Sequence, residues 1–139
     1  MDWGPYNNPF EDEIRQILAV ALGACVYLQP VLSRGTDYSV LQSPSTGPRI
    51  TAINFDRSSE AMATADESGC VTIWDVAKTQ KLRVLKCHAR KVNSISWNRS
   101  PVCPYLLTSG SSDTLILNHD LRVKNSVVNM ITQHEGEIC

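Results

Sequence analysis

The sequence has almost no net charge, no long apolar segment and no export signal, and each absence excludes a class of protein. Its 13 basic and 14 acidic residues leave a formal net charge of −1. That balance gives no electrostatic reason to expect nucleic acid or a membrane surface as a partner. The longest apolar run covers residues 17–22, far below the roughly 20 residues that cross a bilayer. Because residues 1–5 also lack a basic segment followed by an apolar one, we expect a soluble intracellular protein.

The sequence also lacks the usual patterns of metal and cofactor sites. Its five cysteines are an odd number without paired spacing, which does not fit a disulfide framework. Cys87 and His88, with His134 and Cys139, have neither of the paired spacings of a zinc site. A glycine-rich phosphate loop is also missing. We therefore expect no metal and no cofactor.

What the sequence does contain is a repeat. The stretch 69–75 reads Gly-Cys-Val-Thr-Ile-Trp-Asp, and related stretches lie about 45 positions upstream, at 23–29, and downstream, at 113–120. A period of about 40–45 residues that ends in Trp-Asp is typical of WD repeats, each of which forms one four-stranded blade of a β-propeller. The fold class is therefore predicted to be all-β.

The repeat divides the whole chain, residues 1–139, into a partial WD-repeat propeller. Propellers usually have four to eight blades, so we expect either a fragment or a ring completed by association. The predicted pieces are blade one at about 17–41, blade two at about 50–85, blade three at about 92–132, and the start of a fourth at 134–139.

Two patterns conflict near the N-terminus. Apolar positions 10, 14, 17, 18 and 21 would fit one face of a helix. The repeat register instead aligns residues 18–21 with 62–65, in the second strand of the next blade. We follow the register and predict a strand over 17–21, with at most one helical turn over 10–15.

Polar residues recur at fixed places in the third repeat. His88, Ser109 and Asp113 match positions that form a buried hydrogen-bond relay in WD repeats, which ends on the tryptophan of the third strand. Here His119 takes the place of that tryptophan, so the relay is altered. A catalytic Ser/His/Asp arrangement uses the same residue types, but no nucleophile elbow or oxyanion-hole motif accompanies them. The structural signature residues are His88, Ser109, Asp113, Trp74, Asp75, His119 and Asp120.

The similarity extends beyond generic WD repeats. Residues 2–3 (Asp-Trp), 18–28 (LAVALGACVYL), 88–98 (HARKVNSISWN) and 109–122 resemble the Fizzy and Fizzy-related family. These proteins are WD-repeat activators of the anaphase-promoting complex, a ubiquitin ligase. Gln29 stands where the family has tryptophan, and residues 4–16 resemble an insertion. Both departures suggest a divergent member, which could be specialised for meiosis.

The resemblance implies a function without catalysis. It implies an adaptor that recognises substrates of the anaphase-promoting complex in cell-cycle proteolysis, in the nucleus and cytoplasm. The implied partners are this ligase and proteins with short degradation motifs, with no nucleic acid or membrane. Asp2 matches a residue that takes part in motif binding, although a solvated terminal residue is an equally good interpretation. The alternative function is a generic WD-repeat scaffold for protein interactions, unrelated to the ligase.

Overall fold

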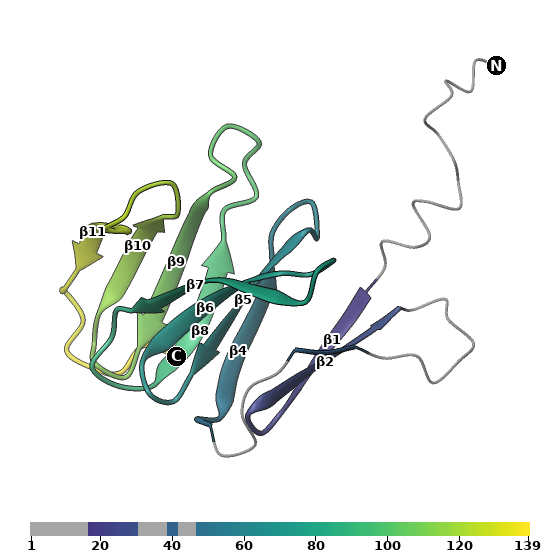
Figure 1. Cartoon of the computed structure of the whole chain (residues 1–139). Coiled ribbons are helices and arrows are strands. Elements are labelled where there is room, and N and C mark those ends of the chain that lie inside the picture. Colours follow the sequence, from purple (N-terminus) through teal and green to yellow (C-terminus); the bar gives the residue numbers. More distant parts are fainter. Residues whose placement is uncertain (1–16, 31–38, 42–46) are drawn as a thin grey trace.

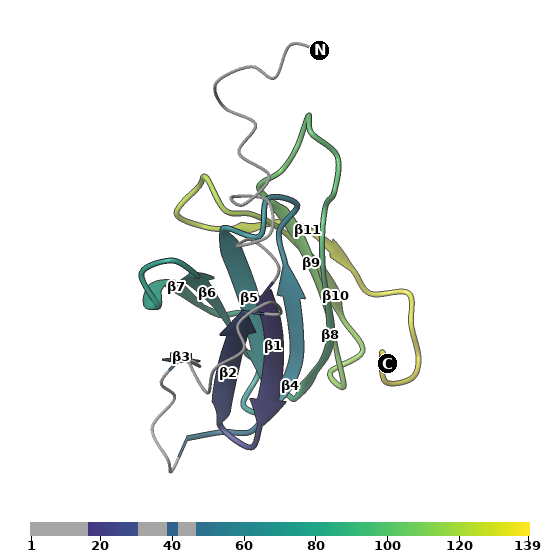
Figure 2. The same ribbon diagram turned by 90° about the vertical axis from the view of Figure 1, so that its right-hand side faces the viewer.

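The computed structural model describes residues 17–30, 39–41 and 47–139, and these residues form eleven strands in three antiparallel sheets. The sheets stand side by side with their faces toward one another (Figures 1 and 2). None of the described residues forms a helix that could cross a membrane. The first sheet contains β1 (Ile17–Leu22), β2 (Cys25–Pro30) and β3 (Ser39–Leu41). The second contains β4 (Ile50–Phe55), β5 (Ala61–Asp66), β6 (Cys70–Asp75) and β7 (Gln80–Lys86), and the third β8 (Val92–Trp97), β9 (Leu106–Ser111), β10 (Ile116–Asp120) and β11 (Val127–Ile131).

The predicted strand near the N-terminus is confirmed, since β1 pairs with β2 along its whole length. Its residues alternate between half-buried and exposed, as a strand with one covered face requires. A two-residue turn joins the pair, and Gly23 adopts the left-handed conformation there, with φ 62°. The repeat register therefore outweighs the helical spacing over residues 17–22. The predicted helical turn at 10–15 lies outside the described residues.

The three sheets are equivalent units that differ in their number of described strands. Ala19 pairs with Leu28 in the first sheet as Ala63 pairs with Ile73 in the second. Strand β1 is thus the counterpart of β5, the second strand of its sheet. The described part of the first sheet therefore corresponds to the second, third and fourth strands of a blade. At the other end, residues 134–139 form no strand, but the Ile138 N–H donates to the Ser111 carbonyl at 3.1 Å.

The core consists of two layers of side chains, one on each face of the second sheet. On one face Met62, Trp74 and Val76 pack with three residues of the first sheet, namely Val26, Leu28 and Leu41. On the other face, side chains of β5 and β6 pack with β8 and β9. The members of this second layer are Ala63, Ala65, Val71, Ile73, Leu85, Val92, Ile95, Trp97 and Leu107. Strand β7 lies at the edge of its sheet and is mostly exposed, with Arg83 half-buried and Leu85 buried.

Trp74 is the largest side chain in the layer between the first two sheets, and it is 5% exposed. Its Nε1–H donates to Thr64 Oγ1 at 2.9 Å, and the Lys81 ammonium lies 5.3 Å from its ring centroid. We predict that Trp74→Ala lowers the free energy of unfolding by about 3–5 kcal/mol, because it removes a buried ring and leaves a cavity. Chemical denaturation of the purified protein measures the loss.

The matched control for this prediction is Val102→Ala, because Val102 is 77% exposed and should change stability by less than about 0.5 kcal/mol. A loss below about 1 kcal/mol for Trp74→Ala would contradict the packing between the first and second sheets.

Candidate functional site

A chain of hydrogen bonds runs through the third sheet. Nδ1 of His88 lies 2.9 Å from Oδ2 of Asp113, and its Nε2 lies 2.8 Å from Oγ of Ser109. Ser109 Oγ is also 2.8 Å from Nε2 of His119, whose Nδ1 lies 3.2 Å from Oγ of Ser126. The structure thus brings together the residues that the sequence singled out as a relay. It adds Ser126, which sequence reasoning missed.

The charge of Asp113 sets the direction of the protons in this chain. Burial alone would raise the pKa of Asp113, but hydrogen bonds from the Leu115 backbone N–H and from His88 outweigh it and lower the pKa. An ionised carboxylate only accepts, so His88 Nδ1–H donates to it. With neutral rings, Ser109 then donates to His88 and accepts from His119 Nε2–H. In this arrangement each polar side-chain atom of the relay has a hydrogen-bond partner.

The relay is closed to substrates. Ser109 and His119 are fully buried, and both ring nitrogens of His88 and of His119 are engaged. Burial is the largest cause that lowers the pKa of His119 to about 4, so its ring is neutral at physiological pH. A serine that already bridges two imidazoles and has no access to solvent cannot serve as a nucleophile. The geometry therefore supports structure rather than catalysis.

Two of the three signature aspartates, Asp75 and Asp120, close the turns that follow a third strand. Asp75 Oδ1 accepts the backbone N–H of Lys78 at 2.9 Å, and Asp120 Oδ1 accepts that of Arg122 at 3.0 Å. Each carboxylate thus fixes the chain directly after the third strand of its sheet. Asp120 also forms an ion pair with Arg122 at 2.7 Å. Asp2 and Trp3 lie outside the described residues.

The suggested zinc ligands do not come together. His88 is committed to the relay, and burial raises the pKa of the Cys87 thiol to about 11, which keeps it protonated. Within residues 17–30, 39–41 and 47–139, no three His, Cys, Asp or Glu side chains gather as a metal site would require.

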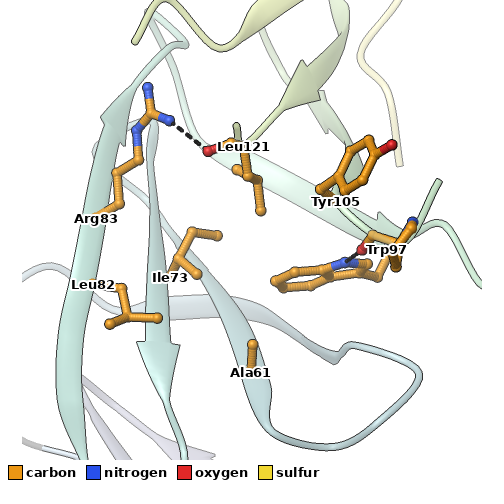
Figure 3. A pocket seen from close by; sticks show the side chains of 8 residues that line it. Ala61, Ile73, Leu82, Arg83, Trp97, Tyr105 and Leu121 are labelled. Carbon is orange, nitrogen blue, oxygen red and sulfur yellow. Dashed lines mark hydrogen bonds between the residues drawn. The ribbon is translucent and has the colours of Figure 1, made fainter. Parts of the chain in front are cut away.

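A surface groove between the second and third sheets is the best candidate for a binding site (Figure 3). It has a volume of about 390 Å³ and a mostly apolar lining. Strand β7 supplies one wall through Leu82 and Arg83, while Trp97 and Tyr105 come from the two ends of the β8–β9 loop. The remaining lining residues are Ala61, Ile73, Pro104 and Leu121.

Polar contacts hold the walls of this groove in place. Arg83 donates to the carbonyl oxygens of Leu121 at 3.1 Å and Val123 at 2.7 Å, and also to that of Lys124. These bonds tie β7 to the loop after β10. On the opposite wall the Trp97 Nε1–H donates to the Pro104 carbonyl at 2.6 Å. The groove is therefore largely preformed, so a ligand need not order these walls.

A cation lies against the ring of Tyr105, one of the residues that line the groove. The guanidinium of Arg122 lies 3.6 Å from the ring centroid of Tyr105, and it donates two hydrogen bonds to the Asp120 carboxylate, at 3.0 and 2.7 Å. A cation–π contact of this kind holds the tyrosine ring flat against the arginine.

A second cavity of about 380 Å³ adjoins Arg83 and is basic. It lies between β7 and the start of β11, and Lys86 and Lys124 are part of its lining. No aspartate or glutamate lines it among the described residues. Since Arg83 lines both cavities, the apolar groove and the basic cavity lie next to each other.

Sequence reasoning missed this groove. Trp97 packs in the core, at 6% exposure, but it also lines the groove. The alternation of Leu82 and Arg83 was the available signal, because it placed an apolar and a cationic side chain on successive positions of an outermost strand. A cavity between two sheets depends on distances that a repeat pattern does not give.

Comparison with known families agrees with the repeat. Residues 35–75 and 79–119 match the family described as WD domain, G-beta repeat. The chain is 34% identical over 134 residues to the anaphase-promoting complex subunit cdc20 of Dictyostelium discoideum, with 96% of this chain and 26% of the relative covered. It is 33% identical over 141 residues to meiotic fizzy-related protein 1 of Schizosaccharomyces pombe, with 100% and 29% covered. The chain therefore spans less than a third of the length of these relatives.

Solved structures show the same architecture. A chain in the crystal structure of the mitotic checkpoint complex superimposes with a TM-score of 0.80 at 28% identity, over 91% of this chain and 37% of that one. The WD40 repeats of RRP9 superimpose with a TM-score of 0.74 at 18% identity, over 87% and 36%. The second likeness shows the fold alone.

The relay predicts how stability depends on pH. The pKa of His119 is about 4 in the folded chain and 6.5 in its ordinary state, so the unfolded chain binds more protons between these values. Above pH 6.5 His119 is neutral in both states and the free energy of unfolding has its full value. As the pH falls toward 4, proton uptake by the unfolded chain lowers this free energy. We expect this residue to lower the free energy of unfolding by about 3 kcal/mol across that window.

Urea denaturation at several pH values checks this dependence, with His119→Gln as the control. Glutamine does not titrate, so the variant should lose less stability between pH 6.5 and pH 4 than the parent chain. Equal losses in the two proteins would show that the protonation of His119 is not linked to unfolding.

Proposed function

Because the chain belongs to the WD-repeat family, we propose that it is a substrate-recognition adaptor of the anaphase-promoting complex in cell-cycle proteolysis. Several relatives support this proposal through their names, which include a subunit and a cofactor of that complex. The name of a fizzy-related relative points to meiosis as one setting. The adaptor would bind proteins without chemistry of its own, in the nucleus and cytoplasm.

The observation that carries the proposal is that the apolar groove between the second and third sheets lies next to the basic cavity. The apolar cavity is large enough for one or two side chains of a short linear motif, and the cations beside it suit an acidic residue of the same motif. We propose that substrate proteins bind here as extended peptides. Trp97, Tyr105 and Arg83 have the residue types that dominate binding energy at protein interfaces.

The expected affinity is modest. Burial of one Leu- or Phe-sized side chain contributes about 1.5–3 kcal/mol, and one exposed ion pair about 0.2–1 kcal/mol. A peptide held by these two contacts binds weakly and leaves quickly. Such exchange suits an adaptor that must release each substrate, and further contacts elsewhere on the substrate would add to the affinity through linkage.

A substitution in the groove tests this function. Leu82 is 60% exposed, so the Leu82→Glu variant should still fold. The substitution places a carboxylate in the lining of the apolar groove. We expect it to weaken the binding of a peptide with a Phe or Leu anchor and an acidic residue by about tenfold or more, because the anchor loses its apolar contact and the acidic residue meets a like charge. Fluorescence anisotropy with labelled peptides measures the affinity.

The matched control is Val128→Glu, which introduces the same charge at another exposed apolar position, on β11 and outside the lining of both cavities. It should bind the peptide like the parent protein. If both variants bind equally well, the groove is not the peptide site.

Asp2 supports a second, separate contact with degradation motifs, on the resemblance of the Asp2-Trp3 pair to the family. A carboxylate there would accept charge-assisted hydrogen bonds, which are roughly twice as strong as neutral ones. We expect Asp2→Ala to weaken the binding of a Lys-Glu-Asn peptide by roughly 1–3 kcal/mol, with little change in melting temperature. Calorimetric titration measures the affinity. Asp120→Ala is the control, because loss of a turn aspartate should lower stability first. Unchanged peptide affinity in Asp2→Ala would remove Asp2 from the site.

A further inference from the structure

The basic cavity contains positive charges that nothing in the described chain neutralises. Lys86 reaches it from β7, and Lys124 reaches it from the segment before β11, so the two lysines belong to different walls. Among the described residues, neither ammonium group takes part in an ion pair or a side-chain hydrogen bond. Both side chains are exposed at the cavity. The cavity therefore presents two free cations to a ligand.

The other polar side chains of the cavity are partly committed. Arg83 already donates to three backbone carbonyl oxygens of the loop after β10, one of which is that of Leu121 (Figure 3). The hydroxyl of Ser126 belongs to the relay, since it contacts His119. The side-chain amide of Asn125, by contrast, has no hydrogen-bond partner within the described part of the chain. The available donors are thus two ammonium groups and one amide.

This set of donors suits a phosphate monoester better than a carboxylate. A phosphorylated serine or threonine carries about 1.5–2 negative charges at neutral pH and has three strong acceptor oxygens. It can therefore neutralise both lysines and also accept from the amide. A carboxylate has one charge and two oxygens, which leaves part of the positive charge uncompensated. Lysine ammonium groups end flexible stems, so they can turn toward one group of oxygens.

The basic cavity continues the apolar groove along one strand. Residues 82 and 83 of β7 line the groove, and residues 83–87 line the basic cavity. A strand advances about 3.3 Å per residue, so four residues of β7 span roughly 13 Å. An extended peptide beside β7 would therefore reach the basic cavity about two to four residues away from a side chain in the groove. Side chains two or four residues apart also lie on the same face of an extended chain.

We propose that the basic cavity binds the phosphate of a phosphorylated serine or threonine in a partner protein, two or four residues from the apolar side chain that fills the groove. The proposal rests on the function proposed for the groove, and it names the substrates that use it as phosphorylated segments. A protein segment is favoured over free phosphate or a lipid headgroup because only a peptide fills both cavities at once.

The first experiment measures peptide affinities of the full chain by fluorescence anisotropy. Each labelled peptide has one Phe anchor and carries serine, glutamate or phosphoserine at one position, two or four residues to either side of the anchor. At the preferred position, phosphoserine should bind about five- to tenfold more tightly than serine and about twofold or more tighter than glutamate. High salt should reduce these differences. If phosphoserine has no advantage over glutamate at any of the four positions, the phosphate site is refuted.

The second experiment locates the phosphate with Lys86→Gln and Lys124→Gln. Each variant removes one cation at an exposed position, and circular dichroism checks that it folds. Each should lower the advantage of phosphoserine over serine by about threefold and leave the affinity for the serine peptide nearly unchanged. Lys78→Gln is the matched control, because Lys78 is exposed and lines neither cavity. An equal effect in Lys78→Gln would show a general effect of charge and overturn the assignment.

The two experiments separate this proposal from the function of the groove. If the serine peptide binds and phosphoserine adds nothing, the groove keeps its function and the phosphate site fails. If the phosphoserine peptide binds equally well with alanine in place of the Phe anchor, the phosphate site is supported and the groove fails. Absence of binding by every peptide would refute both. Displacement of the phosphoserine peptide by an equal concentration of inorganic phosphate would indicate a site for the free anion and overturn the assignment to a protein segment.

Discussion

The whole structure depends on one constraint, which is that a blade cannot bury its apolar faces by itself. The second sheet has small or apolar residues on both faces of β5 and β6, and each face is covered by a different neighbour. Association of sheets is therefore the folding event, because burial between them supplies the stabilisation that no isolated sheet has. Trp74 and Trp97 are the largest side chains in these two layers, one in each.

Trp74 in the second sheet and His119 in the third occupy the same repeat position, and their buried polar groups find hydrogen-bond partners in different ways. In the second sheet Trp74 donates to Thr64 and the chain of hydrogen bonds ends there, because an indole has one donor and no acceptor. In the third sheet His119 replaces it and contacts Ser109 on one side and Ser126 on the other. An imidazole has two polar atoms, so the replacement extends the network to the segment before β11. It also introduces a group whose neutral form the fold requires.

The sequence predicted the repeat, the strand over residues 17–21 and the polar residues of the third sheet, because these depend on periodicity and on residue type at fixed offsets. It did not predict that His119 would also contact Ser126. Strands β10 and β11 pair with a shift in register between Asn118 and His119, and the repeat pattern does not indicate such a shift. The groove was missed for a similar reason. Leu82, Trp97 and Tyr105 lie on three segments, and only the spacing between two sheets brings them around one cavity.

The place of the groove follows from how the sheets are arranged. The innermost strands β4 and β8 contact each other directly, and Thr51 of one donates its hydroxyl to the Val92 carbonyl of the other. Farther out the sheets diverge, because each twists and is inclined to its neighbour. Side chains must fill the widening gap, and at Ala61 and Ile73 they are too short to do so. Arg83 spans the gap with hydrogen bonds to three carbonyls instead of filling it with apolar volume. A cation that is held by backbone oxygens keeps the two sheets at a fixed distance, and the apolar space beside it stays open for a ligand.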